Sequence, residues 1–125
     1  MKTLQTVRIV IKLSGLILIC LMPDVVWGHV FPEHSEPEVG ETITVSPSRV
    51  RIWFDGALEP VFSNLLVQNT NGQQIDKADS HVDASDPTLL EVSLPPLPHG
   101  TYRVIWNAVA RDGHRTTGDY TFTIE

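Results

Sequence analysis

The residues of this chain that could do chemistry together are two histidines and an aspartate: His29, Asp112 and His114. If a protease removes residues 1–28, His29 becomes the first residue of the chain. Its α-amine and one imidazole nitrogen can then close a chelate ring on a single metal ion, and both nitrogens suit Cu(II). Cleavage after Gly28 therefore predicts a chelating amino terminus before any fold is considered.

Residues 1–28 have the pattern of a secretory signal peptide. Lys2, Arg8 and Lys12 form a positive start, an apolar run follows from 13 to 22, and Val26–Gly28 offers a cleavage site. The apolar run is shorter than the roughly 20 residues of a membrane-spanning helix. We therefore expect an exported domain made of residues 29–125, with no stable membrane anchor after cleavage.

Asp112 and His114 flank Gly113 in the segment that joins the last two expected strands. Residues two apart in an extended chain point to the same face, so a carboxylate oxygen and an imidazole nitrogen can converge on one ion. Asp-Gly is also a common turn dipeptide, and an ordinary solvated histidine is the alternative. Together with the amine and imidazole of His29, the pair supplies four donors, enough for the tetragonal geometry of Cu(II).

The sulfur-containing residues all precede the expected domain. Cys20 is the only cysteine, and the two methionines are Met1 and Met22. Residues 29–125 therefore offer nitrogen and oxygen ligands alone, which favour Cu(II), Zn(II) or Ni(II) over Cu(I). The net charge of the whole chain is −6, and an acidic surface disfavours binding to nucleic acid.

Short alternating segments between frequent prolines and glycines predict a single all-β domain. We expect strands at 49–54, 65–68, 89–94, 102–108 and 120–124, with a turn at Asn71-Gly72. Trp53 and Trp106 alternate with apolar partners and are expected in the core. The start of the domain, His29–Glu38, is expected to be mobile.

Five motifs follow one another along residues 29–125. They are Ser35–Gly40, Val50–Phe54 before Glu59-Pro60, Asp86–Leu89, Leu94–Leu97 before Gly100–Tyr102, and Trp106 through Asp112-Gly113-His114 to Gly118. With a histidine directly after the expected cleavage site, this order resembles the CopC family of periplasmic copper-resistance proteins.

The resemblance implies a cupredoxin-like fold, an immunoglobulin-like Greek-key β-sandwich or barrel. It also implies a Cu(II) site made by the terminal histidine, the aspartate and the second histidine, which here are His29, Asp112 and His114. Further implications are a periplasmic location and an inner-membrane copper-transport partner of the CopD type.

Other polar residues are weaker candidates. The methionine-rich Cu(I) loop of some relatives has no counterpart in Gln68–Asp86, which carries His81; a second site of hard ligands and an exposed polar loop are the alternatives there. Asp55 lies close to where some relatives place an acidic residue near the copper. His34 could fold back onto the ion of His29, but we expect it in solvent, and we expect His99 at the surface.

The expected function is therefore an exported Cu(II)-binding protein for copper homeostasis or resistance that buffers copper or passes it on. Residues 29–125 show neither a glycine-rich phosphate loop nor a nucleophile elbow, and no enzymatic activity is expected. Two alternatives stay open. One is a metal-free immunoglobulin-like interaction module, and the other is a copper-dependent oxidative enzyme with an amino-terminal histidine ligand, as in lytic polysaccharide monooxygenases.

Overall fold

The computed structural model describes residues 29–125, so the expected signal peptide and its cleavage site lie outside the described residues. The elements are β1 (Pro32–Glu36), β2 (Thr42–Ile43), β3 (Arg49–Phe54), β4 (Asn64–Gln68), β5 (His81–Val82), β6 (Leu89–Ser93), β7 (Gly100–Val109) and β8 (Arg115–Ile124). Within this range no helix is long and apolar enough to cross a membrane.

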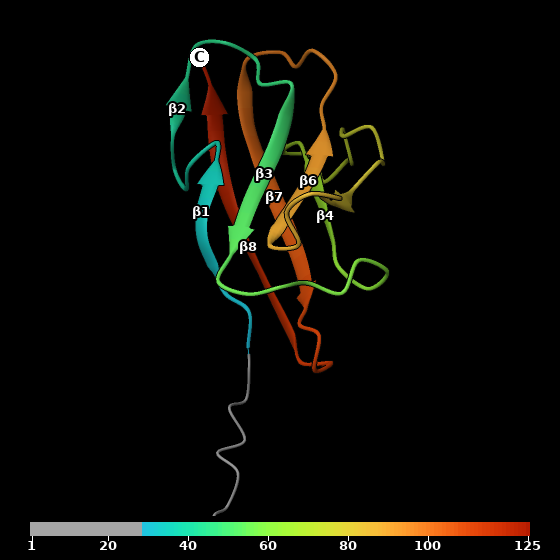
Figure 1. Ribbon diagram of the computed structural model, residues 1–125. Helices are drawn as coiled ribbons and strands as arrows, with labels where there is room; N and C mark the ends of the chain where they lie inside the picture. Colours follow the sequence, from blue (N-terminus) through green and yellow to red (C-terminus); the bar gives the residue numbers. More distant parts are fainter. Residues whose placement is uncertain (1–28) are drawn as a thin grey trace, which may run out of the picture.

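The strands form two four-stranded sheets that face each other, which confirms the expected β-sandwich (Figure 1). One sheet has the order β1-β3-β6-β5, and the other has the order β2-β8-β7-β4. The pairs within each sheet are antiparallel, except that β2 runs parallel to β8. The longest strands, β7 and β8, form a hairpin whose turn lies at the end of the sandwich where the chain enters at His29.

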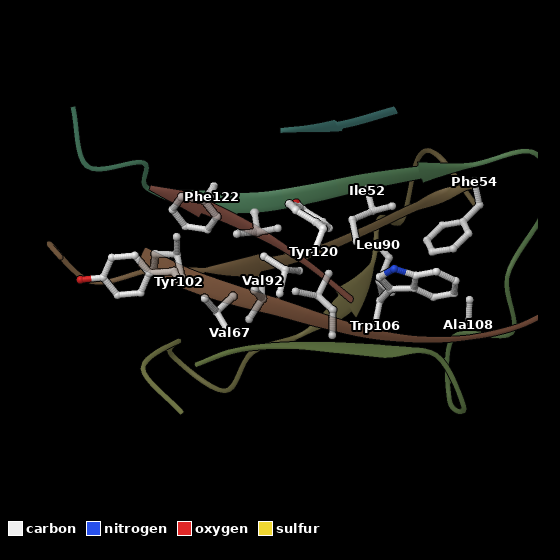
Figure 2. Packing of buried hydrophobic residues seen from close by; sticks show 14 of the residues in the cluster. Ile52, Phe54, Val67, Leu90, Val92, Tyr102, Trp106, Ala108, Tyr120 and Phe122 are labelled. Carbon is white, nitrogen blue, oxygen red and sulfur yellow. The ribbon is translucent and has the colours of Figure 1, made fainter. Parts of the chain in front are cut away.

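The core lies between the two sheets because successive side chains of a strand point to opposite faces. In β3, Val50, Ile52 and Phe54 are buried, and in β7 the buried set includes Val104 and Trp106. Figure 2 shows Ile52, Phe54 and Trp106 packed among the side chains of β6 and β8. Phe54 and Trp106 meet edge to face at the site end, with ring centroids 5.5 Å apart, so the expectation that Trp106 is a core residue is confirmed.

The expectation that Trp53 is a core residue is wrong. Trp53 lies between Ile52 and Phe54 in β3, and the strand alternation turns its side chain to the outer face of the sheet, where it is half-buried. There its ring lies 5.1 Å from the ring of His34 and 5.3 Å from the guanidinium carbon of Arg51. Neighbouring outward-facing side chains, rather than the core, cover this tryptophan.

The five expected strands are present, and the structure adds three short ones, β1, β2 and β5. The start of the domain is not a mobile segment throughout, because β1 pairs with β3. Only one residue of the five in β1 is buried, so its sequence carries no apolar alternation. Strand β8 begins at Arg115 instead of Tyr120, because Arg115–Asp119 continue the ladder with β7 although most of them are exposed.

The two buried tyrosines are expected to lower the stability of the fold at alkaline pH. Burial raises the pKa of Tyr120 to about 12 and also raises the pKa of Tyr102 above 10.0. The folded state then keeps protons that the unfolded chain releases above about pH 10. We expect the free energy of unfolding to be unaffected by these groups below that pH and to fall as the pH rises toward 12. Denaturant titrations at several pH values measure this, and Tyr120→Phe should flatten the dependence.

Candidate metal centre

The turn between β7 and β8 carries two of the three expected site residues. The amide of Ala110 donates to the carbonyl of His114 at 2.8 Å, and the amide of Gly113 donates to the carbonyl of Ala110 at 2.9 Å. Gly113 has a φ of 89°, a conformation that favours glycine over residues with a Cβ. The turn is therefore closed by its own backbone and presents Asp112 and His114 on either side of the glycine.

Asp112 and His114 lie in direct contact. Oδ1 of Asp112 is 3.0 Å from the His114 Nδ1 and also accepts the backbone N–H of His114 at 3.0 Å. Both side chains are about one-third exposed. Two donors 3.0 Å apart have the separation of adjacent ligands on one ion, because bonds of about 2.0–2.2 Å meet near a right angle in tetragonal geometry.

His29 lies beside this pair although 85 positions separate it from His114 in the sequence. The centroids of the two imidazole rings are 5.1 Å apart, with the ring planes inclined by 60°. His29 and Asp112 also line one pocket of about 320 Å³, together with Asp55 and Ala110. The fold therefore brings together all three residues that the sequence singled out.

The segment that carries His29 is fixed to the sandwich on both sides. Val30 is buried, and its carbonyl accepts a 2.6 Å hydrogen bond from the Thr116 hydroxyl of β8. Gly56 leaves room for Val30, because a Cβ at position 56 would lie 3.0 Å from Val30 Cγ1. These contacts, which the sequence reasoning missed, hold the chain directly after His29. A threonine in an alternating strand gives no sequence signal for this role.

Asp55 holds the same segment from the other side. Its Oδ1 accepts the backbone N–H of Phe31 at 2.8 Å, and its own N–H donates to the Phe31 carbonyl at 2.9 Å. Asp55 follows β3 directly and lines the pocket with His29. The carboxylate therefore positions the segment that carries His29 and adds negative charge beside the expected cation.

The contact between Asp55 and Phe31 predicts different outcomes for two substitutions. Asp55→Ala removes the acceptor and should lower copper affinity about 10-fold, the lower end of the usual effect of an outer-shell partner. Asp55→Asn keeps a carbonyl oxygen in the same place and should retain most of the affinity. Competition titrations measure affinity, and hydrogen exchange of the Phe31 amide reports whether the segment is held. An Asn variant as weak as the Ala variant would mean that charge, not positioning, is what Asp55 supplies.

The side chains of His29, Asp112 and His114 lie near one another, but they do not by themselves form a metal site in this structure. Across residues 29–125, no three side chains of His, Cys, Asp and Glu are arranged to hold a metal ion. The fourth expected donor is not a side chain but the α-amine of His29. In the 125-residue chain this nitrogen is a peptide amide, because Gly28 precedes it. Cleavage would convert this amide into an amine next to the Asp112–His114 pair.

The remaining histidines lie away from this pocket. His34 points to the outer face of the first sheet, where its Nε2 lies 3.7 Å from Oε1 of Glu36, so it is exposed as expected. His81 belongs to β5 and contacts Glu91. His99 is exposed in the connection before β7. None of the three is among the pocket-lining residues.

The protein is thus an all-β sandwich with two histidines and an aspartate close together at one end, and comparisons with known proteins define its family. The sequence model of the CopC domain matches residues 32–125. The chain therefore belongs to the CopC family, which confirms the resemblance drawn from the motifs.

Relatives and solved structures agree with this assignment. Copper resistance protein C of Escherichia coli is 29% identical over 84% of this chain and 94% of its own length. The crystal structure of PcoC, a methionine-rich copper resistance protein of E. coli, matches with a TM-score of 0.69 and 30% identity, over 78% of this chain and all of PcoC. The copper transport protein CutJ of Bacillus subtilis is 29% identical over 87% of this chain, which spans about a fifth (20%) of CutJ.

Family membership settles the general class of function. The protein is a copper-binding protein of the copper-resistance type, and the family consists of copper-binding and copper-transport proteins rather than enzymes. The expectation that the chain has no enzymatic activity is thereby confirmed. Membership also counts against the metal-free interaction module and the oxidative enzyme.

Proposed function

We propose that this chain is exported to the periplasm as a Cu(II)-binding protein whose ligands are the amine and imidazole of His29, Asp112 and His114. It buffers copper there or passes the ion to a copper-transport protein of the inner membrane. The observation that carries the proposal is the convergence of the His29 ring, 5.1 Å from the His114 ring, with the Asp112–His114 pair.

The oxidation state follows from the donor atoms. Imidazole, amine and carboxylate are ligands that suit Cu(II), whereas Cu(I) prefers the soft sulfur of cysteine and methionine. Residues 29–125 contain neither cysteine nor methionine. In this respect the chain differs from PcoC, which is described as methionine rich. We therefore assign Cu(II) as the cargo.

Export and delivery rest on two further observations. The positive start and apolar run of residues 1–28 are typical of a cleaved signal peptide, and cleavage would also create the amine ligand. CutJ is called a copper transport protein and contains a region similar to this chain within a much longer polypeptide. A domain that is joined to a transport protein in one organism is a reasonable source of copper for a separate transport partner in another.

A Cu(II) titration of the chain that begins at His29 tests the proposal. We expect one tightly bound ion, and electron paramagnetic resonance should show nitrogen couplings from amine and imidazole. His114→Ala should weaken binding at least about 100-fold, because loss of a ligand exceeds the usual effect of losing an outer-shell partner. His99→Ala is the matched control, since His99 is exposed and does not line the pocket. Undiminished one-to-one affinity in His114→Ala would refute the assignment.

A further inference from the structure

Outside the metal centre, His81 occupies an unusual position between two hydrogen-bond acceptors. Its Nδ1 lies 2.8 Å from the backbone carbonyl of Asp79, and its Nε2 lies 3.0 Å from Oε1 of Glu91. A neutral imidazole carries one N–H and one lone pair, so it can satisfy only one of these acceptors. The imidazolium form carries two N–H groups and donates to both. The surroundings of His81 therefore match its protonated form.

His81 lies in the connection between β4 and β6, where this connection pairs with β6 at the edge of the first sheet. His81 pairs with Glu91 across β5 and β6. On one side of this pair, the amide of Lys77 donates to the Ser93 carbonyl at 2.9 Å. On the other side, the amide of Asp83 donates to the Leu89 carbonyl at 2.9 Å. Residues 77–83 thus run along β6, and the His81–Glu91 contact is a side-chain link in the middle of this attachment.

We propose that His81 is a proton-dependent clasp that holds residues 77–83 against β6 when it is charged and loosens them when it is neutral. Release of the proton to solvent leaves one ring nitrogen with a lone pair that faces an acceptor, either the Asp79 carbonyl at 2.8 Å or the Glu91 carboxylate at 3.0 Å. That contact changes from a charge-assisted hydrogen bond to a repulsion between two acceptors, and the other contact keeps its hydrogen bond but loses the charge assistance. Strand β5 has only two residues, and the backbone bonds of Lys77 and Asp83 lie just beyond its two ends, so the ring contact acts at the centre of the attachment.

The charges around the clasp support the direction of the effect. The hydrogen bond to the Asp79 carbonyl, then the charge of Glu91, raise the pKa of His81 above 6.5, although partial burial opposes them. The Asp79 carboxylate acts in the same direction. Among the cations of β3, Arg49 lies 3.8 Å from the other oxygen of Glu91, and Arg51 is engaged with Glu36 of β1 at 2.9 Å.

Strong acid is also expected to weaken the attachment of residues 77–83 to β6. The Asp79 carboxylate accepts the backbone N–H of Ser93 at 2.8 Å, and hydrogen bonding to Ser93 lowers the pKa of Asp79 below 3.8. This contribution is present above the ordinary range of an aspartate and is lost as the pH falls through the lowered value. The His81 contribution is complete below 6.5 and is lost as the pH rises through the raised value. The segment is therefore held most tightly in mildly acidic solution.

Loosening this segment would affect two strand edges. The same connection supplies Asp76 and Ser80, whose side-chain oxygens accept the backbone N–H groups of Val67 and Leu65 in β4 at 2.8 Å. Strand β4 is an edge strand, and unpaired edges are sites of strand addition. The clasp thus gives the protein a pH-dependent control over the edges of β4 and β6.

Hydrogen exchange of the Asp83 amide tests the proposal in the full domain between about pH 5 and 8. EDTA is present so that no metal ion bridges the neutral imidazole and Glu91. After correction for intrinsic exchange, protection of this amide should fall about two- to fivefold with rising pH, the range for an exposed ion pair. His81→Gln, which cannot take up a proton, should show no such fall, and His99→Gln should behave as the parent protein.

A direct titration of the His81 ring by NMR provides a second measurement, made first on the parent protein and then on Glu91→Gln. A midpoint above 6.5 that moves down in Glu91→Gln supports the clasp. A midpoint at or below 6.5, or an Asp83 amide whose protection follows the same pH profile in the parent protein and His81→Gln, overturns it.

Discussion

Acetylation of the α-amine in a chain that begins at His29 is expected to weaken Cu(II) binding at least about 100-fold, more than the loss of an outer-shell partner. The acetyl group removes the donor that closes the chelate ring with the imidazole, and it leaves the Asp112–His114 pair intact. Competition titration and nitrogen couplings in electron paramagnetic resonance measure the result. Unchanged affinity after acetylation would remove His29 from the ligand set.

The sequence allows this modification to be made at a single amine. Lys77 is the only lysine after residue 28, so Lys77→Arg leaves the α-amine as the sole reactive amine of the domain and keeps the positive charge. Extending the chain is a poorer test. A chain that starts at Trp27 places the histidine third, and an amine, two amides and an imidazole then form a square-planar Cu(II) chelate by themselves.

Gly118→Ala is expected to destabilise the fold by about 3 kcal/mol, the upper part of the usual range for overpacking. Gly118 of β8 faces Trp106 of β7 in the ladder, and a Cβ there would lie 2.5 Å from Cζ2 of the indole. The indole is rigid and packed against Phe54, so it cannot move aside at low cost. The midpoint of thermal unfolding should fall by roughly 12–24 °C for a domain of this size.

Two further variants separate this clash from a general sensitivity of β8. Thr117→Ala changes an exposed neighbour and should alter stability by less than about 0.5 kcal/mol. Trp106→Leu removes the indole, so that Gly118→Ala introduced into that background should cost far less than in the parent protein. Additive effects of the two substitutions would show that the glycine is needed for a reason other than space for Trp106.

The core pattern could be predicted from sequence where one face of a strand is apolar throughout. In β3 the alternation of Val50, Ile52 and Phe54 identifies the buried face, and the turn at Asn71-Gly72 is present, with a φ of 75° at Gly72. The same alternation would have placed Trp53 on the outer face. The expectation that Trp53 is a core residue is wrong because the register of β3 turns position 53 outward, although its large aromatic side chain is of a type common in cores.

The remaining strands could not be predicted because their pairing is not encoded locally. Strand β1 has a single buried residue, and a register shift between Pro32 and His34 interrupts its ladder. In β8 the first half is mostly exposed and carries Gly118, a residue that weakens strands in isolation. The extended form of this half is maintained by five of the ten register pairs that β8 makes with β7.

The sequence by itself determined the chemistry of the donors and the faces of the main strands, because residue type and spacing along one chain fix both. The sequence identified His29, Asp112 and His114 as candidate ligands, but it could not show that His29 lies beside His114. Tertiary structure decided that, through Thr116 holding Val30 and Asp55 holding Phe31. It also placed His34, five residues after His29, on the outer face of the first sheet beside Trp53 and Glu36. Such contacts join segments far apart in sequence, and only the closed sandwich brings them within reach.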